Sequence, residues 1–281
     1  MNQNPATSEW AAARGEKWRT QCAGMEAMLA PVEEPLLRAL HPEGPSRIAD
    51  IGCGGGGMTL DILRSAPAGS IVHGFDISPV LIELARHRIP PHERAIAFEI
   101  ADMATATAPE ALYDRLVSRF GIMFFADAPA AFANIARWLT PGGRFAFAAW
   151  GSPAENPWTT SVRDVVASIV DLPPVDPEAP GPFRYADAGK LLSLLSQAGF
   201  GNLDVQDWRG GLSIGGGLPA PEAANFALAA FSSFGELLAA AGDAAVKDAH
   251  QLLTSHFSPF EKGGGVRMEA SVHIFTGARP G

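Results

Sequence analysis

The amino-acid sequence predicts an α/β fold, in which an open sheet of seven mostly parallel strands carries helices on both faces. Between residues 46 and 150, short apolar runs alternate with amphipathic stretches, as in strands that are joined by helical crossovers. A cluster of glycines directly follows the first apolar run, and an acidic residue stands at the end of each of the next two. The chain has 281 residues, of which 47% are hydrophobic, so a sizeable core can be buried and global disorder is excluded.

The first five strands are recognised by short runs of apolar or alternating side chains. The third run shows the alternation most clearly, because Ile96, Phe98 and Ile100 share one face, which is the two-residue period of a strand. The strands that we expect in this part of the chain are residues 47–51, 70–76, 95–101, 115–120 and 144–150.

Helices are expected between several of these strands. One follows the glycine cluster over residues 58–64. Ser78 precedes Pro79, a pair that favours the cap and first turn of a second helix with one apolar face. Asp127 caps a third helix, in which apolar side chains recur at helical spacing, and Pro141-Gly142-Gly143 ends it.

The rest of the chain is expected to complete the sheet and to cover it. Residues 151–186 are rich in proline, and their composition over 173–183 indicates a loop. The further elements that we expect are a helix over 188–198, a strand over 200–208, two or three helices over 221–257 divided at Gly235 and Gly242, and a last strand over 267–276. The three parts are an N-terminal helical cap (1–45), a core (46–155), and a lid excursion with the C-terminal strands that complete the sheet (156–281).

Composition limits the partners and the compartment. The chain has 21 basic and 30 acidic residues, a net charge of −9 and a pI near 5.2, which argues against unaided binding to nucleic acid or to an anionic membrane surface. Cys22 and Cys53 are too few for a disulfide framework and fit a reducing compartment. With no signal peptide and no apolar run of about 18 residues, we expect a cytoplasmic monomer or homodimer without membrane insertion.

The most informative segment is the glycine cluster between residues 48 and 57. Glycine lets the backbone turn sharply and lets a ligand approach closely, and the N-terminus of the following helix favours an anionic group. The spacing fits two templates. Gly52-x-Gly54-x-x-Gly57 matches the dinucleotide fingerprint, whereas Gly52-x-Gly54-x-Gly56 with an acid two residues earlier matches the loop that binds S-adenosylmethionine. A tight turn without a ligand is a third interpretation.

Three carboxylates help to distinguish the two cofactors. Asp50 stands just before the turn, where it suits a ligand with an ammonium and a sulfonium better than it suits a pyrophosphate. Asp76 ends the second expected strand, where an acid accepts the ribose hydroxyls of either cofactor. Asp102 and Met103 follow the third strand and suit an adenine amino group and ring, whereas a dinucleotide fold needs no acid there.

The motifs occur in the order ADIGCGGG, GFDIS, IADM, LVSRFGIMFFAD and LTPGGRFAFAAW. With this order the chain resembles the class I S-adenosylmethionine-dependent methyltransferases, and most closely their ubiquinone/menaquinone-biosynthesis-like small-molecule branch. The resemblance covers about residues 15–155 with specific motifs and the rest in outline, and it implies a Rossmann-like fold. The sequence departs from the family at Gly55, where a small polar residue often stands.

The resemblance also implies where S-adenosylmethionine binds. The glycine loop would hold its methionine part, Asp76 its ribose and Asp102 its adenine, while the end of the fourth strand lines the methyl-donor side. In the family an aromatic residue of the entry helix often reaches the cofactor, and Trp18 is the candidate. Together with Asp50, the candidate cofactor-binding residues are Trp18, Gly52, Cys53, Gly54, Gly56, Asp76, Ile77, Asp102, Met103, Ser118, Arg119 and Phe120.

Methyl transfer from a sulfonium is an in-line displacement, so an enzyme mainly supplies alignment and proximity. A general base is needed only where the acceptor atom is protonated, and the sequence assigns no catalytic residue. It contains no HxxxH, HExxH or CxxC pattern, so we expect no metal site. We also expect no nucleophile elbow. The candidate walls of the acceptor pocket are Phe120, Met123, Phe124, Trp150, Trp158, Phe183 and Phe226. They predict a small apolar or aromatic acceptor.

A small-molecule methyltransferase is therefore the first hypothesis. An NAD(P)-dependent oxidoreductase is the alternative from another enzyme class. It is disfavoured because Asp50 and Asp102 would have no role there, and because the sequence has no Tyr-x-x-x-Lys pattern. A cofactor-binding module without turnover and a methyltransferase of RNA or protein also stay open.

Overall fold

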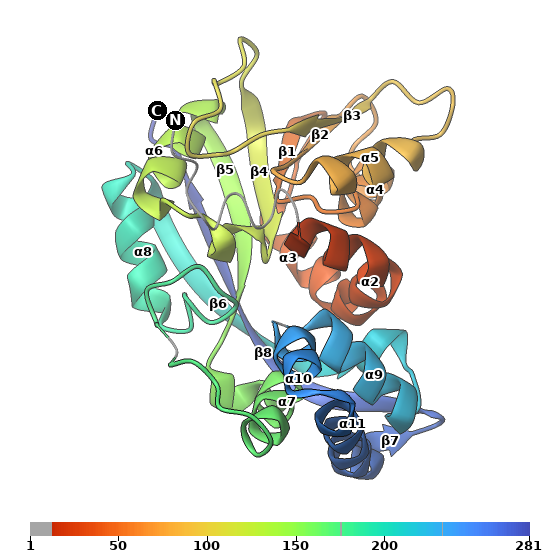
Figure 1. Cartoon of the computed structure of the whole chain (residues 1–281). Coiled ribbons are helices and arrows are strands. Elements are labelled where there is room, and N and C mark those ends of the chain that lie inside the picture. Colours follow the sequence, from red (N-terminus) through yellow and green to blue (C-terminus); the bar gives the residue numbers. More distant parts are fainter. Residues whose placement is uncertain (1–12, 175, 232) are drawn as a thin grey trace.

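The computed structural model describes residues 13–174, 176–231 and 233–281, which form one central sheet with helices on both sides (Figure 1). Seven strands follow the order β3-β2-β1-β4-β5-β8-β6. Within the described residues an eighth strand, β7 (Glu261–Lys262), forms a short hairpin with β8. The predicted α/β fold with a mostly parallel sheet is confirmed, and the expected count of seven strands is short by this hairpin.

Five parallel strands make up the first part of the sheet, and β1 lies between β2 and β4. The order along the chain therefore reverses beside β1, and a crevice opens at the carboxyl ends of the strands at such a reversal. The five strands are β1 (Arg47–Ile51), β2 (Ile71–Asp76), β3 (Ile96–Ile100), β4 (Tyr113–Arg119) and β5 (Leu139–Trp150).

The helices that cover this part are α4 (Gly57–Ser65), α5 (Pro79–His87), α6 (Ala128–Trp138) and α8 (Ala188–Gln197). Helices α4 and α5 lie on one side of the sheet, and α6 and α8 lie on the other (Figure 1). The cap predicted for α6 is confirmed, because the Asp127 carboxylate accepts a hydrogen bond from the Ala130 amide at 2.9 Å. Ser78 is the N-cap residue of α5 and Pro79 lies in its first turn, as predicted, but the Ser78 side chain does not supply the cap. The Ser78 amide donates to the Asp76 carboxylate at 2.9 Å, and its hydroxyl makes no cap bond.

The C-terminal half adds two long strands and a group of helices. Strand β8 (Gly265–Ala278) runs antiparallel to both β5 and β6 (Gly201–Ser213). Figure 1 shows β6 and β8 continuing away from the parallel strands toward the helical group. That group contains α7 (Pro157–Ala167), α9 (Ala220–Ala230), α10 (Phe234–Ala241) and α11 (Asp243–Phe257).

Several boundaries differ from the prediction; β6, for example, extends to Ser213 instead of residue 208. Two further differences have a clear physical reason. Strand β5 starts at Leu139 instead of residue 144, because Leu139 already pairs with Tyr113 and residues 140–143 bulge out of the ladder. Gly235 does not divide two helices but lies in the first turn of α10. A Cβ on Gly235 would lie 2.9 Å from the Leu228 carbonyl oxygen, so this glycine lets the start of α10 approach α9.

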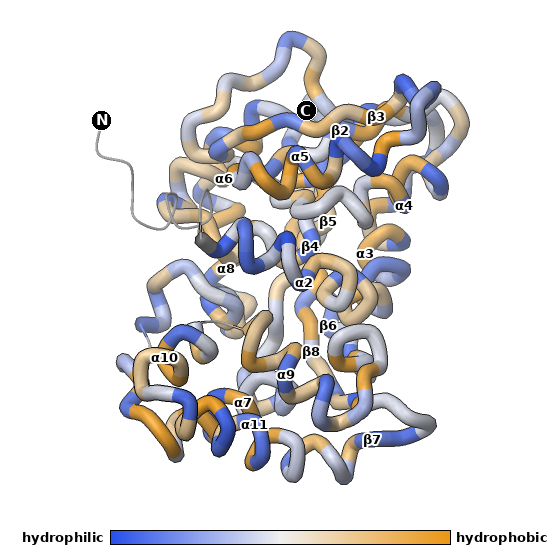
Figure 2. The backbone as a smooth tube through the Cα atoms, turned by 45° about the vertical axis from the view of Figure 1, so that its right-hand side comes forward, coloured by the Kyte–Doolittle hydropathy of each residue, from blue (hydrophilic) through white to orange (hydrophobic). Residues whose placement is uncertain are grey.

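The N-terminal helices α2 (Ala13–Leu29) and α3 (Glu33–Leu40) connect the two halves. Helix α3 contacts β4 and β5, and α2 contacts both α5 and α9. Figures 1 and 2 show α2 between the helices that cover the parallel strands and the helical group below them. Helix α2 is therefore placed to form a wall at the carboxyl ends of the strands.

Within the three described ranges, no single helix has the length and apolar character that a membrane crossing requires. Helices α9 and α10 meet that measure of length and composition only when they are joined across a 96° bend.

Candidate functional site

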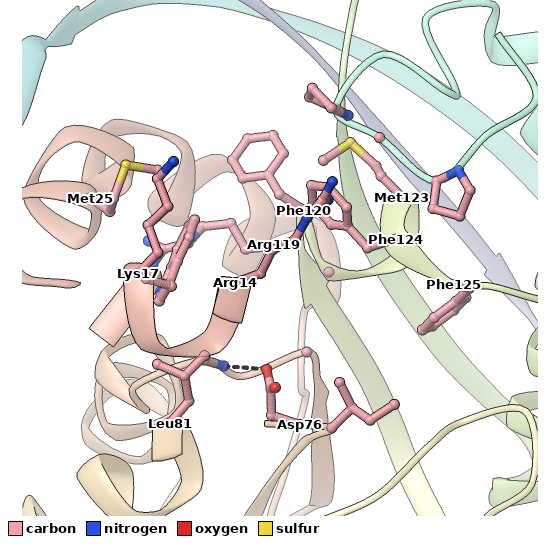
Figure 3. A pocket seen from close by; sticks show the side chains of 18 of the residues that line it. Arg14, Lys17, Met25, Asp76, Leu81, Arg119, Phe120, Met123, Phe124 and Phe125 are labelled. Carbon is pink, nitrogen blue, oxygen red and sulfur yellow. Dashed lines mark hydrogen bonds between the residues drawn. The ribbon is translucent and has the colours of Figure 1, made fainter. Parts of the chain in front are cut away.

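A cavity of about 420 Å³ opens at the carboxyl ends of the parallel strands, within the size range of small-molecule sites. Its described lining comes from α2, the turns after β1 to β5, α7, the loop before α8, and the segment between α9 and α10. Figure 3 shows Lys17 and Met25 on one side of this cavity, Met123 and Phe125 on the other, and Asp76 below them.

The turn after β1 supplies a floor without side chains. Gly52 and Gly54 line the cavity and have φ angles of 72° and 57°, which favour glycine. A Cβ on Gly52 would lie 2.8 Å from the Cα of Gly121, so a larger residue would push apart the turns that follow β1 and β4. The amides of Gly52 and Cys53 donate to the Phe75 carbonyl at 2.7 and 3.0 Å, which fixes the turn to the end of β2.

Asp76 lies at the end of β2 and faces the cavity (Figure 3). Its Oδ2 accepts a hydrogen bond from the Gly54 amide and its Oδ1 one from the Ser78 amide, each at 2.9 Å. Burial raises the pKa of Asp76, and these backbone donors counteract that shift. Each carboxylate oxygen keeps further acceptor capacity, so the group is fixed in place and can still accept hydroxyl donors.

Asp102 lines the same cavity beyond the end of β3. Its Oδ1 accepts from the Ala104 amide at 2.9 Å, and the neighbouring Ala101 amide donates to the Asp76 carbonyl at 2.9 Å. The backbones that carry the two acids are thus hydrogen-bonded to each other. Ile77 and Met103 also line the cavity, and they provide an apolar surface between the two carboxylates.

Asp50 lies beneath the glycine turn and not on the cavity surface. It is fully buried, its Oδ2 accepts from the Thr59 hydroxyl at 2.7 Å, and its Oδ1 has no protein partner among the described residues. Burial raises the pKa of Asp50 to about 7. Because Thr59 belongs to α4, this hydrogen bond ties the end of β1 to the helix that follows the turn.

Three more candidate residues support the site from behind the lining. Cys53 is packed among apolar residues of α4, α5 and β3. A Cβ on Gly56 would lie 2.7 Å from the Phe98 ring and 2.8 Å from the Ala85 Cβ. The Ser118 hydroxyl donates to the Ile51 carbonyl at 2.6 Å and is buried. Contact of Cys53, Gly56 and Ser118 with the cofactor stays a prediction.

Arg119 ends β4, lines the cavity and forms an ion pair with Glu33 of α3 at 3.0 Å. Burial raises the pKa of Glu33, and the charge of Arg119 counteracts this shift. Arg119 therefore brings a positive charge to the cavity on the side of the glycine turn while it also anchors α3.

Four aromatic rings form a continuous wall at the other end of the cavity. The Phe120 and Trp150 rings stack with centroids 4.0 Å apart. Trp158 follows at 4.7 Å from Trp150, and Phe231 at 4.9 Å from Trp158. Phe120 has a φ of 67°, a strained value for a non-glycine residue, which turns its ring toward Trp150.

Asn156 holds this aromatic wall in position. Its side chain is fully buried, and its Oδ1 accepts hydrogen bonds from the Trp158 indole at 3.0 Å and from the Ser271 amide at 3.2 Å. Its Nδ2 donates to the carbonyls of Ser152 and Ser271 at 2.9 and 3.1 Å. One amide thus connects the turn after β5, strand β8 and the indole that lines the cavity.

The cavity includes residues that the sequence analysis missed and leaves out two of the aromatic residues that it proposed as walls of the acceptor pocket. Phe183 and Phe226 do not line it; the loop before α8 contributes Pro180, Gly181 and Pro182 instead. The Gly181 amide donates to the Met123 carbonyl at 3.1 Å, which holds this loop over the cavity. The missed residues include Arg14, Lys17, Gln21, Met25 and Leu29 of α2, and Ala230 and Phe231. The missed residues of α2 are spaced by three or four positions, so they share one face of the helix. This spacing is visible in the sequence and could have identified them.

The described residues contain no group of three metal-ligating side chains. Among the described lining residues the acids are Asp76 and Asp102, and none is a histidine. The arrangement can bind a ligand that has both a polar part and an apolar part, and it can align that ligand against a second, apolar molecule.

Comparison with known proteins agrees with this geometry. Residues 48–143 match the family model described as a methyltransferase domain, which spans β1 to the start of β5. The chain is 34% identical over 112 residues to a demethylmenaquinone methyltransferase of Deinococcus radiodurans, covering 40% of this chain and 46% of that protein. It is 32% identical over 118 residues to an aklanonic acid methyltransferase of a Streptomyces species, covering 42% of this chain and 54% of that protein. The matches thus span about half the length of these relatives.

A solved structure shares the fold. Phosphoethanolamine N-methyltransferase 2 of Haemonchus contortus, in complex with phosphomonomethylethanolamine and S-adenosylhomocysteine, superposes with a TM-score of 0.52 at 18% identity. The superposition covers 89% of this chain and 53% of that chain. The likeness supports the sheet and its helices as a Rossmann-like fold.

Proposed function

We propose that the chain is an S-adenosylmethionine-dependent methyltransferase that acts on a small molecule, starting from the match of residues 48–143 to a methyltransferase domain. The observation that carries this proposal is the arrangement around the glycine turn. Asp76 and Asp102, at the ends of adjacent strands, line one cavity together with Gly52 and Gly54. The missing side chain of Gly52 lets the turns after β1 and β4 meet at the floor of that cavity.

The residues present fit this cofactor. Asp76 would accept the ribose hydroxyls with the oxygens that Gly54 and Ser78 already hold in place. Asp102 would accept from the adenine amino group, while Ile77 and Met103 provide an apolar surface for the ring. When bound, the cofactor supplies a methyl group on a positively charged sulfur, which is a leaving group that needs no further activation.

The acceptor end of the cavity suits an apolar or aromatic molecule. Phe120, Trp150 and Trp158 line it, and Met123 and the loop at Pro180 close it from the side. Such a surface excludes water and orients an acceptor by shape. The contribution of this chain to the reaction is then to hold the acceptor atom in line with the methyl group, which alone lowers the barrier substantially.

We extend the proposal to the partners and the compartment. The net charge of −9 argues against nucleic acid as the acceptor, and the relatives named above carry small-molecule names. Cys22 and Cys53 are buried and unpaired, which fits a reducing, cytoplasmic compartment. We propose a monomer or homodimer that is not inserted in a membrane.

Two measurements test the proposed function. S-adenosylhomocysteine should raise the melting temperature and NADH should not, because a ligand that binds the folded state stabilises it. Incubation with a methyl donor that carries an isotopically labelled methyl group and a metabolite extract should then yield a labelled product, found by its mass. Stabilisation by NADH alone would overturn the proposal, and cofactor binding without any labelled product would indicate a module without turnover.

A further inference from the structure

Two glycines of the glycine cluster face α2 and not the cavity. Neither Gly55 nor Gly57 lines the cavity. A Cβ on Gly55 would lie 2.6 Å from the Cys22 Sγ, and one on Gly57 would lie 2.7 Å from the Glu26 Oε1. The missing side chains at these two positions therefore allow α2 to pack directly against the turn after β1.

Two charged side chains make polar contacts at this junction. Arg88 follows α5, and its Nη1 donates to the Glu26 Oε1 at 2.7 Å and to the Gly55 carbonyl at 2.8 Å. The same Glu26 oxygen accepts from the Gly57 amide at 3.3 Å. Because Gly57 is the first residue of α4, its amide has no partner within the helix. One ion pair thus joins α2, α5 and both sides of the glycine turn.

The adjoining face of α2 forms a wall of the cavity, with Trp18, Gln21 and Met25 among its lining residues. Figure 3 shows Met25 and Lys17 on the α2 side of the cavity. The Trp18 Nε1 lies 3.4 Å from the position of a Cβ on Gly54, so the indole covers the turn at the residue whose amide holds Asp76. A displacement of α2 would therefore open the proposed cofactor end of the cavity.

The pair is shielded from water on both sides, unlike the ion pairs that Lys17 and Arg19 form. The side chains of Arg88 and Glu26 are 28% and 23% exposed. Those of Arg19 and Glu16, both in α2, are 47% and 52% exposed, and those of Lys17 and Glu236 are 22% and 63% exposed. Exposed ion pairs contribute little because water competes for them. The Arg88 and Glu26 pair also satisfies a backbone carbonyl and a backbone amide, so a change in either residue leaves those groups without a partner.

We propose that Glu26 and Arg88 are positioning residues that hold α2 against the glycine turn, and that this contact determines how long the cofactor stays bound. The inference rests on the proposed function. Neither side chain lines the cavity, so both act through other groups. Arg88 acts through the Gly55 carbonyl. Glu26 acts through the Gly57 amide, and it holds in place the helix that carries Trp18.

The test uses the full chain and S-adenosylhomocysteine as the probe. Arg88→Met removes the donor and keeps the length of the side chain, and we expect it to weaken binding about tenfold, mainly through faster dissociation. Without ligand, amide hydrogen exchange over residues 18–26 should speed up, while the melting temperature changes little. Arg19→Met, which makes the same change within α2 at an ion pair more exposed than that of Arg88 and Glu26, is the matched control and should bind like the wild type.

Glu26→Gln keeps an oxygen for the Gly57 amide and loses the charge, so its affinity should fall between the wild type and Arg88→Met. It also provides the test if Arg88→Met fails to fold. Wild-type affinity and dissociation rate in a folded Arg88→Met variant, or in Glu26→Gln alone, would overturn the inference. A wild-type chain that does not bind the probe would instead overturn the proposed function.

Discussion

Asp50 is the buried carboxyl whose charge we expect to affect the stability of this fold most. Burial raises its pKa to about 7, and neither the Thr59 hydrogen bond nor the charge of Arg119 restores the ordinary value. The perturbation is Asp50→Asn, which keeps the shape of the side chain and an oxygen for the Thr59 hydroxyl while it removes the charge.

The expected magnitude follows from the pKa in the two states. In the unfolded chain the pKa of Asp50 is near its ordinary value of 3.8, and in the folded chain it is about 7. Between these values the folded state retains a proton that the unfolded state has released, so the free energy of unfolding falls as the pH rises. A shift of about three units corresponds to about 4 kcal/mol at a pH above 7, and to nothing below about pH 4.

We therefore expect Asp50→Asn and the wild type to be similarly stable near pH 4. At pH 8 we expect the variant to be more stable by about 2–4 kcal/mol, with the lower bound allowing for the lost attraction to Arg119. Urea unfolding of both proteins at four pH values, followed by tryptophan fluorescence, measures this difference directly. A variant that is less stable than the wild type at pH 8 would refute the reasoning, since it would show that the buried carboxylate is well compensated.

Three further predictions concern the ligands. Asp76→Ala should weaken S-adenosylhomocysteine binding by about 2–3 kcal/mol in calorimetry, because the ribose hydroxyls lose a charged acceptor; unchanged affinity would remove Asp76 from the site. Asn156→Asp should lower the free energy of unfolding by about 1–3 kcal/mol and raise the KM for the acceptor, while the affinity for S-adenosylhomocysteine stays the same. If acceptor binding and S-adenosylhomocysteine binding weakened equally, the role of Asn156 would not be confined to positioning Trp158. Deleting residues 173–183 should reduce acceptor selectivity more than cofactor affinity, whereas an equal effect on both would identify this loop as a folding element.

The parallel half of the fold follows closely from the sequence because local signals coincide there. Apolar runs, the glycine turn and the acids at the strand ends all indicate the same boundaries, and Asp76 and Asp102 lie in one cavity as expected. The expectation for Gly235 failed because this glycine does not end a helix. Its missing side chain instead makes room for the Leu228 carbonyl at the close approach of α9 and α10.

The rest of the site depends on contacts between distant segments that a single sequence does not display. Gly55 and Gly57 look like parts of a ligand turn, yet their neighbours are Cys22 and Glu26, from a helix about thirty residues earlier. Phe183 was the aromatic candidate in the loop before α8, but the chain turns so that the preceding residues reach the cavity instead. The aromatic and proline side chains of this loop indicated that it lines the cavity. Which of its residues do so depends on how the loop packs against the rest of the protein.

The most direct test of the account is a crystal structure of the chain with S-adenosylhomocysteine. We expect both ribose hydroxyls within hydrogen-bond distance of the Asp76 carboxylate, the adenine amino group near Asp102, and the sulfur directed toward the aromatic wall at Phe120. A ligand bound elsewhere, or an adenosine that contacts neither acid, would contradict it.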